Sequence, residues 1–216
     1  MLPNGQGCMQ YFGRDSLVSY DGEWHQGIWH GYGSLQFQSQ DCYVGEFRNG
    51  SREGTGTYMW NDGSQYEGRF EQDARTGKGC FTWADGNFYK GDFVNGKREG
   101  LGQYTFVKSG DMYSGHWKDG HYYGFGVFTW SDGRTYRGNW KNSQRHGKGT
   151  ECDCDGHIVY HGQWENHQPV GSEQEQELKE KVEAKEESRT AVLPTSNTSP
   201  APTPRLPSQA SHRTAH

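Results

Sequence analysis

A short motif of aromatic residues and glycine recurs seven times along this 216-residue chain and constrains its fold more than any other feature. In each copy a tyrosine is followed two residues later by glycine, and two residues further on by tryptophan or phenylalanine. Successive tyrosines are separated by 23 or 24 residues; they are Tyr20, Tyr43, Tyr66, Tyr89, Tyr113, Tyr136 and Tyr160. A fixed period of about 20–50 residues is typical of arrays in which each unit packs only on its neighbours.

The second half of each unit is equally regular. It reads Gly-x-Gly-x-Φ-x-Φ, where Φ is apolar, as in residues 54–60. A period of two indicates β-strands, so each unit should contain two strands that carry glycines and rings on one face. We expect Asp62-Gly63 to form the tight hairpin turn and Asn49-Gly50 to begin a looser connection. The positions expected to maintain the repeat are Tyr43, Gly45, Tyr66, Gly68, Tyr89, Gly91, Tyr113, Gly115, Tyr136 and Gly138.

The combined motif, Tyr-x-Gly-x-Trp/Phe followed by Gly-x-Gly-x-Φ-x-Φ and Asp-Gly, resembles the MORN repeat. The resemblance covers residues 20–171, and residues 1–19 resemble a partial repeat. Either this partial repeat caps the array, or the sequence is a fragment or a truncated isoform. The resemblance implies an all-β fold, which is an elongated, single-layer, twisted antiparallel sheet of tandem hairpins. With two strands per unit and about 4.8 Å between strands, seven units would extend for roughly 65–70 Å.

The composition fits a thin sheet better than a two-layer core. Hydrophobic residues make up 30% of the chain, and about half of them are aromatic. We hypothesise that the rings of one unit lie over the glycine backbone of its neighbour and so bury area without a second layer. Two units depart from the pattern. Asp73 suggests a different loop in the third unit, and Glu151 and Asp153 replace the apolar pair of the sixth, which predicts a polar C-terminal cap.

The composition of the chain changes after Gly171. Residues 172–189 contain Glu-before-Lys pairs at a spacing of four, such as Glu177 and Lys181, so we expect a short, charged, partly helical segment that is solvated. A partner-binding helix is the alternative interpretation. Residues 190–216 are rich in Pro, Ser and Thr without periodicity, which predicts a disordered tail.

Composition and motifs disfavour several classes of function. The formal net charge of -5 gives no concentrated basic face for nucleic acid. The Gly-x-Gly pairs lie inside expected strands without a following helix, so they lack the geometry of a phosphate-binding loop. The sequence shows no recognised nucleophile pattern, and a one-layer sheet offers no deep pocket. We therefore expect no enzymatic activity, no cofactor and no small-molecule substrate.

The sequence predicts a cytoplasmic protein. No stretch approaches the roughly 18 apolar residues that a membrane-spanning helix needs. The N-terminus lacks the basic stretch and apolar run of a signal peptide. Without an export signal, the five cysteines are expected to be reduced thiols.

One group of side chains has the ligand types that suit zinc: Cys152, Cys154, His157 and His161. The two cysteines are separated by one residue, whereas zinc-binding pairs usually have a gap of two, and the period places His161 in the next strand. We favour surface thiols and histidines in a degraded repeat, without a bound metal, and keep a zinc site as the alternative.

The tenth position of the unit is arginine in four repeats, at Arg52, Arg75, Arg98 and Arg145. Trp29 and Tyr122 occupy this position in two other repeats, and Lys78 and Lys148 recur between the two glycines of the unit. Equivalent positions lie two strand spacings, about 10 Å, apart, so this arginine row, together with the two lysines, should line one edge of the sheet. One interpretation is a row that binds an acidic helix or lipid head groups. The other is a solvated row that prevents aggregation and pairs with Glu53, Asp92 and Glu99.

The leading functional hypothesis is a non-enzymatic scaffold that binds a partner protein along the aromatic and glycine-rich face. The residues expected to contact the partner are Trp60, Trp83, Trp130, Arg52, Arg75, Arg98 and Arg145. The resemblance to MORN proteins implies a cytoskeletal or ciliary (axonemal) assembly, with a helical segment among the expected partners and a homodimer left open. The alternatives are weak tethering to acidic phospholipids at a membrane and the regulatory repeat part of a larger enzyme.

Overall fold

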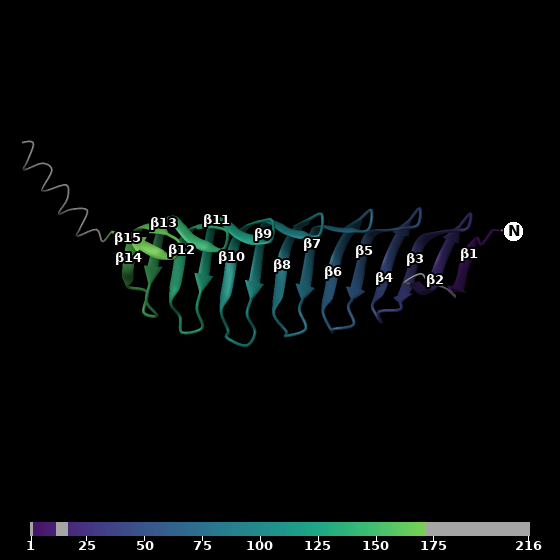
Figure 1. Cartoon of the computed structure of the whole chain (residues 1–216), viewed down its shortest axis with the longest axis horizontal. Coiled ribbons are helices and arrows are strands. Elements are labelled where there is room, and N and C mark those ends of the chain that lie inside the picture. The colour runs from purple at the N-terminus through teal and green to yellow at the C-terminus, as the bar shows by residue number, and fades with distance from the viewer. Residues whose placement is uncertain (1, 12–16, 172–216) are drawn as a thin grey trace, which may run out of the picture. The chain divides into compact units, whose positions relative to one another are not determined.

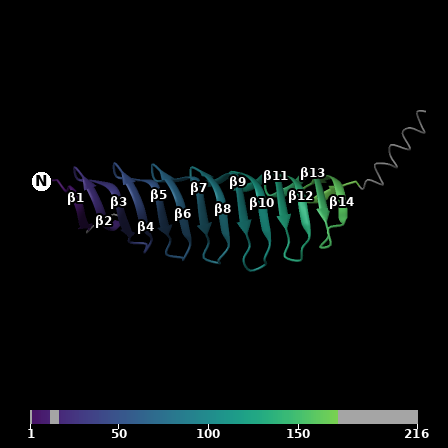
Figure 2. The same ribbon diagram turned by 180° about the vertical axis from the view of Figure 1, so that it is seen from behind.

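The computed structural model describes residues 2–11 and 17–171, which form one open antiparallel sheet of 15 strands (Figure 1). The strands lie side by side in sequence order, and Figure 2 shows the same succession from behind. Their bounds are β1 Gly5–Gln10, β2 Leu17–His25, β3 Ile28–Phe37, β4 Cys42–Arg48, β5 Ser51–Met59, β6 Gln65–Glu71, β7 Ala74–Thr82, β8 Phe88–Val94, β9 Lys97–Thr105, β10 Met112–Lys118, β11 His121–Thr129, β12 Thr135–Lys141, β13 Gln144–Cys152, β14 Ile158–Glu165 and β15 Gln168–Val170.

The predicted all-β array of hairpins is confirmed for these residues, in which strands are the only regular elements. The charged segment expected at 172–189 and the tail expected at 190–216 lie outside the described residues. Each repeat has a constant register. Tyr43 pairs with Tyr58 and Gly45 with Gly56 inside one hairpin, and Gly56 pairs in turn with Gly68 of the next repeat. Glycine therefore faces glycine from one repeat to the next.

The two turns of each repeat are the reverse of the prediction. Asn49 and Gly50 alone connect β4 to β5, and both have positive φ, 51° and 83°, as in a type I′ hairpin turn. Asp62-Gly63 lies in the longer connection between β5 and β6, where the Gly63 N–H donates to the Trp60 carbonyl oxygen. Asn-Gly and Asp-Gly both accommodate left-handed backbone, so the residue types alone could not assign the two turns.

The different loop expected at Asp73 is also not found. Gln72 and Asp73 have φ values of 46° and 69°, so they form the same left-handed pair as Asn49 and Gly50. One carboxylate oxygen of Asp73 accepts hydrogen bonds from the backbone N–H and the Nε of Arg52, at 3.0 and 2.9 Å. These bonds hold a turn without glycine against the preceding repeat.

The buried tyrosine of each repeat lies on glycine backbone. Tyr66 is fully buried, and its ring covers Gly68 of its own strand and Gly79 of the paired strand. A Cβ atom at Gly79 would stand 2.5 Å from the Tyr66 hydroxyl oxygen and 2.6 Å from a ring carbon. The hydroxyl donates a 3.1 Å hydrogen bond to the carbonyl oxygen of Arg69. Ring-over-glycine packing is therefore present, but the tyrosine covers glycines of its own repeat rather than those of a neighbour.

The aromatic residue four positions after the tyrosine joins one repeat to the preceding one. Phe70 meets Tyr66 of its own repeat and Tyr43 of the preceding repeat edge to face, with ring centroids 5.3 and 5.0 Å apart. Trp117, its equivalent in a later repeat, also donates from its indole nitrogen to the Gly102 carbonyl oxygen at 3.1 Å. Each such ring pair contributes about 0.5–1.5 kcal/mol beyond area burial. This row of rings links the repeats without a second layer.

We expect Gly79→Ala to lower the free energy of unfolding by about 1–3 kcal/mol, because the added methyl group would overlap the Tyr66 ring. Urea titration followed by tryptophan fluorescence measures the change. Gly7→Ala is the matched control, since its Cβ would meet only Trp24, at 3.5 Å, among the described residues. Similar losses in both variants would contradict the ring-over-glycine packing.

Candidate partner-binding faces

The arginine row lies on the aromatic face, where each guanidinium covers a buried tyrosine. The Arg75 Cζ atom is 5.5 Å from the centroid of the Tyr66 ring. It is also 5.6 Å from the Trp60 ring and 5.2 Å from the Phe81 ring, so rings enclose the charged group. The same stacking on tyrosine recurs at Arg52, Arg98 and Arg145.

The guanidinium groups also bind the turn of the following repeat. Arg98 Nη2 donates to the Gly120 carbonyl oxygen at 2.7 Å, and Arg75 Nη2 donates to that of Gly96 at 2.9 Å. Burial lowers the pKa of Arg75 and Arg98 below the ordinary arginine value, although arginine stays charged at neutral pH. The row therefore connects repeats as well as covering tyrosines.

The predicted pairing of the basic row is confirmed for Lys78, whose ammonium lies 2.7 Å from an Asp92 carboxylate oxygen, but it is wrong for the arginines. Within the described ranges, the row forms salt bridges from Arg52 to Asp73 at 2.9 Å and from Arg145 to Glu151 at 2.7 Å. The other two acids predicted to pair with the row, Glu53 and Glu99, instead accept hydrogen bonds from backbone N–H groups. Glu53 and Glu99 directly follow an arginine in a strand, and successive side chains point to opposite faces of the sheet.

A planar group at the tenth position is the property that the repeats share. Trp29 stacks on Tyr20 with ring centroids 5.2 Å apart and planes at 21°, and Tyr122 stacks on Tyr113 at 3.8 Å and 12°. Arginine, tryptophan and tyrosine are thus equivalent here as flat covers of the buried tyrosine. Their exchange at one repeat position is visible in the sequence and is the signal from which this structural role could have been predicted.

The three tryptophans proposed as partner contacts belong to an outer row of rings. Trp83 lies between Phe81 and Tyr104, at centroid distances of 4.5 and 5.1 Å, and 5.4 Å from the Arg98 guanidinium. The partly buried rings of the outer row that pack against the buried inner rings are Phe37, Tyr58, Trp60, Phe81, Trp83, Tyr104, Phe128 and Trp130. Phe106 continues the row between Tyr104 and Phe128. Partner binding by these tryptophans stays a prediction.

Hollows on the aromatic face are small. One of about 320 Å³ lies between Arg52 and Arg75, with Trp60 and Asp73 in its lining. An equivalent one of about 260 Å³ lies between Arg75 and Arg98. The hollows recur because the arginine row recurs. The repeat itself therefore accounts for them, and their presence alone does not indicate a binding site.

A larger groove, of about 940 Å³, crosses β5–β10 on the opposite face of the sheet. Five residues that line the groove lie opposite one another on successive strands from β6 to β10. They are, in order, Glu67, Cys80, Lys90, Gln103 and Ser114. These residues alternate with the buried tyrosines or their ring partners, so they point away from the aromatic face. Sequence reasoning missed the groove because it looked for binding where the rings are.

The groove combines positive charge with apolar surface. Lys78 is 74% exposed although its ammonium lies 2.7 Å from an Asp92 carboxylate oxygen. Lys90 is also exposed, and Leu101 exposes 54% of its surface. Glu67 supplies the acid in this lining. The surface suits a partner segment that carries both acidic and apolar side chains.

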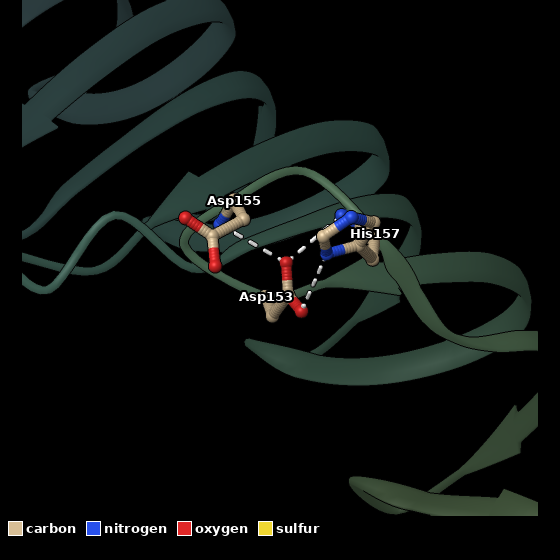
Figure 3. A group of neighbouring side chains, drawn as sticks. All are labelled: Asp153, Asp155 and His157. Carbon is tan, nitrogen blue, oxygen red and sulfur yellow. Dashed lines mark hydrogen bonds and ion pairs between the residues drawn. The ribbon is translucent and has the colours of Figure 1, made fainter.

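The loop between β13 and β14 brings Asp153, Asp155 and His157 together (Figure 3). One Asp153 oxygen accepts hydrogen bonds from the N–H groups of Asp155 and His157 at 3.0 and 2.8 Å. The other lies 3.2 Å from His157 Nδ1. These hydrogen bonds, first that from the His157 N–H, lower the pKa of Asp153. The Asp153 carboxylate therefore stabilises the loop in which it lies.

The set of residues considered for zinc does not assemble in the described part of the chain. The group of potential ligand atoms found at this loop contains His157 together with two aspartates, and neither cysteine belongs to it. His161 Nδ1 lies 2.7 Å from the Thr150 hydroxyl oxygen across the neighbouring strand pair. The strand that follows the loop therefore directs His161 to a different partner.

Seven successive segments of the chain match the model of the MORN repeat: residues 20–42, 43–65, 66–88, 89–110, 113–133, 136–158 and 160–172. An all-β sheet of tandem hairpins with this motif defines a repeat protein, and the chain belongs to the MORN repeat family. No curated protein matches it. No helix among the described residues is long and apolar enough to cross a membrane.

Two similar solved structures are of the TCP10 domain of Danio rerio CPAP. The wild-type domain is 15% identical, covers 62% of this chain and 68% of its own, and has a TM-score of 0.29. The same domain in complex with a peptide of Danio rerio STIL is 12% identical, covers 62% and 74%, and has a TM-score of 0.19. Similarity at this level carries no argument about function.

We expect Arg98→Ala to lower the free energy of unfolding by about 2 kcal/mol, through loss of ring stacking and of the Gly120 hydrogen bond. Arg98→Tyr should restore part of the loss, because Tyr122 fills the same position in the next repeat. Arg137→Ala is the control, because this exposed arginine directly follows Tyr136 in β12 and therefore points away from the aromatic face. Equal effects of all three changes in urea titrations would contradict the role of a planar cover.

Alkaline pH should unfold the array. Burial raises the pKa of Tyr20, Tyr66 and Tyr136 from 10.0 to about 12. The folded chain thus holds these protons more tightly than the unfolded chain. Their contribution to stability is complete below pH 10 and is lost as the pH rises toward 12. Phenolate absorbance and circular dichroism, recorded together, should show these tyrosines ionising with loss of strand signal. Full ionisation near pH 10 in a folded chain would be the contrary result.

Proposed function

We propose that this chain is a non-enzymatic scaffold that binds a partner protein across the face opposite its aromatic rings. The observation that carries the proposal is the groove of about 940 Å³ across β5–β10. Six strands at about 4.8 Å spacing extend for roughly 24 Å, which corresponds to about 16 residues of α-helix. Lys78, Lys90 and Leu101 favour a helical segment with an acidic side and an apolar side.

The aromatic face is the second place where a partner could bind. Its tryptophans and arginines already stabilise neighbouring repeats, and its hollows have about a third of the groove's volume or less. A partner that inserted between these rings would have to displace intramolecular stacking. We therefore place the main contact on the opposite face and treat contacts to Trp60, Trp83 and Trp130 as additional.

A binding role fits the chemistry of the groove better than a catalytic one. Its lining contains the thiol of Cys80 and the charged groups of Glu67, Lys78 and Lys90, but no histidine to act as a base toward the thiol. We propose a cytoskeletal or ciliary setting from family membership alone. Tethering to acidic phospholipids has less support, because the arginine row that would bind head groups is enclosed by rings.

A peptide selection tests the proposed groove. Random peptides of about 16 residues, the helical length that fits the groove, would be displayed and selected on the wild-type chain. We expect enrichment of acidic peptides with apolar side chains four residues apart. The double variant Lys78→Glu/Lys90→Glu should bind them at least about tenfold more weakly in fluorescence anisotropy, a difference of about 1.4 kcal/mol.

The matched control is Lys108→Glu/Lys141→Glu, which reverses two exposed charges outside the groove lining. This control should bind the selected peptides like the wild type. Peptides that lose affinity equally for both double variants would indicate general charge attraction. Peptides that bind the groove variant normally but fail on Trp83→Phe would move the contact to the aromatic face.

A further inference from the structure

One row of side chains on the face opposite the rings runs straight across four repeats. It consists of the residue between the two glycines of each Gly-x-Gly pair in β7, β9, β11 and β13, strands that Figure 1 shows in this order. We refer to it as the Gly-x-Gly row; its members are Lys78, Leu101, Phe125 and Lys148. The glycine after each member belongs to one continuous line of paired glycines across β7–β13, so the row follows that line.

The two central members of the row are exposed apolar side chains. Leu101 exposes 54% of its surface and Phe125 exposes 50%. His116 lies between them, since it pairs with Leu101 and its Nδ1 is 3.0 Å from the Phe125 carbonyl oxygen. Tyr123, also exposed, lies two residues before Phe125 in β11 and so points to the same face. Neighbouring exposed apolar side chains of this kind are typical of a protein contact surface.

The two outer members of the row are exposed cations. The Lys78 ammonium remains largely open to solvent beside the Asp92 carboxylate. Lys148 is exposed as well, and within the described part of the chain it forms no salt bridge. Arg137 and Lys141 of β12 are exposed and alternate with buried rings, so they point to this same face. The row is therefore apolar at its centre and positive toward both ends.

The spacing of the row matches the heptad spacing of an α-helix. Neighbouring members lie two strand spacings, about 10 Å, apart. Seven residues of α-helix rise about 10.5 Å and complete nearly two turns, so residues seven apart lie on one side of the helix. From Lys78 to Lys148 the row covers six strand spacings, about 29 Å, which is close to three heptads. A helix along the row would thus present the same helical position to each repeat.

We propose that the Gly-x-Gly row binds one α-helix of the partner protein in a register of seven helical residues per repeat. Two apolar residues of that helix, seven apart, contact Leu101 and Phe125. Acidic residues seven positions before and after them contact Lys78 and Lys148. The proposal rests on the proposed function, which places a helical partner on this face. It adds the pattern of the partner and extends the contact to β13, past the groove lining, which contains neither Phe125 nor Lys148.

Two synthetic helical peptides of the same composition test the register. Each carries four anchor residues in the order Glu, Leu, Leu, Glu. The anchors are seven residues apart in the heptad peptide. They are nine apart in the control peptide, which places successive anchors on opposite sides of the helix. We expect the heptad peptide to bind the full chain at least about tenfold more tightly in fluorescence anisotropy. Equal affinities of the two peptides would overturn the register.

Substitutions in the row test which residues the helix contacts. Phe125→Ser should weaken binding of the heptad peptide about tenfold, because the ring supplies apolar area at the centre of the row. Lys148→Glu should weaken it about threefold to fivefold through the reversed charge. The matched controls are Val107→Ser and Lys108→Glu, which change exposed side chains between β9 and β10 and should bind like the wild type. Urea midpoints check that all four variants fold.

The outcomes separate this inference from the proposed function. Binding that depends on Lys78→Glu/Lys90→Glu but is unchanged by Phe125→Ser and Lys148→Glu would leave the groove as the site and overturn the row. Selected peptides that bind independently of all these residues would overturn both. Light scattering tests the other occupant. Growth of the chain with concentration that Phe125→Ser abolishes would show that a second copy covers the row, and would overturn the helix as its occupant.

Discussion

The contact between a tyrosine ring and a pair of facing glycines is the constraint on which the rest of this sheet depends. A Cβ at either glycine would overlap the ring or the opposite backbone, so both positions must lack a side chain. In return the ring of Tyr66 is fully buried in a protein that has one layer. Three other features maintain the contact between the tyrosine ring and the two glycines. They are the register of the strands, the bulges and the planar side chain at the tenth position of the repeat.

Those requirements make the two faces of the sheet different, because one face is filled by packed rings and the other carries an open groove. On one face the inner rings, the outer rings and the arginine row contact one another continuously from repeat to repeat. On the other face, positions such as Lys90 and Gln103 have no part in the ring packing and line an open groove. The most prominent features of the sequence therefore lie on the packed face and gave no indication of the groove.

The sequence predicted the array, the strands and the glycine and tyrosine positions, because each depends on spacing within one repeat. It did not predict the turns, since Asn49-Gly50 and Asp62-Gly63 have the same backbone preference and differ in which strand ends they connect. It also misassigned Glu53 and Glu99 as partners of the arginine row. Glu99 is next to Arg98 in sequence, but neighbours in a strand face opposite sides, and the guanidinium reaches a turn 22 residues away.

The sequence by itself determined the repeat length, the alternation of faces and the positions where only glycine fits, because local sterics and periodicity set them. The tertiary structure alone decided what lies on each face: that the arginines stack on tyrosines and that a groove runs behind the rings. Both features depend on contacts between neighbouring strands, such as the stacking of Arg75 in β7 on Tyr66 in β6. Such contacts are fixed by the register and twist of the whole sheet.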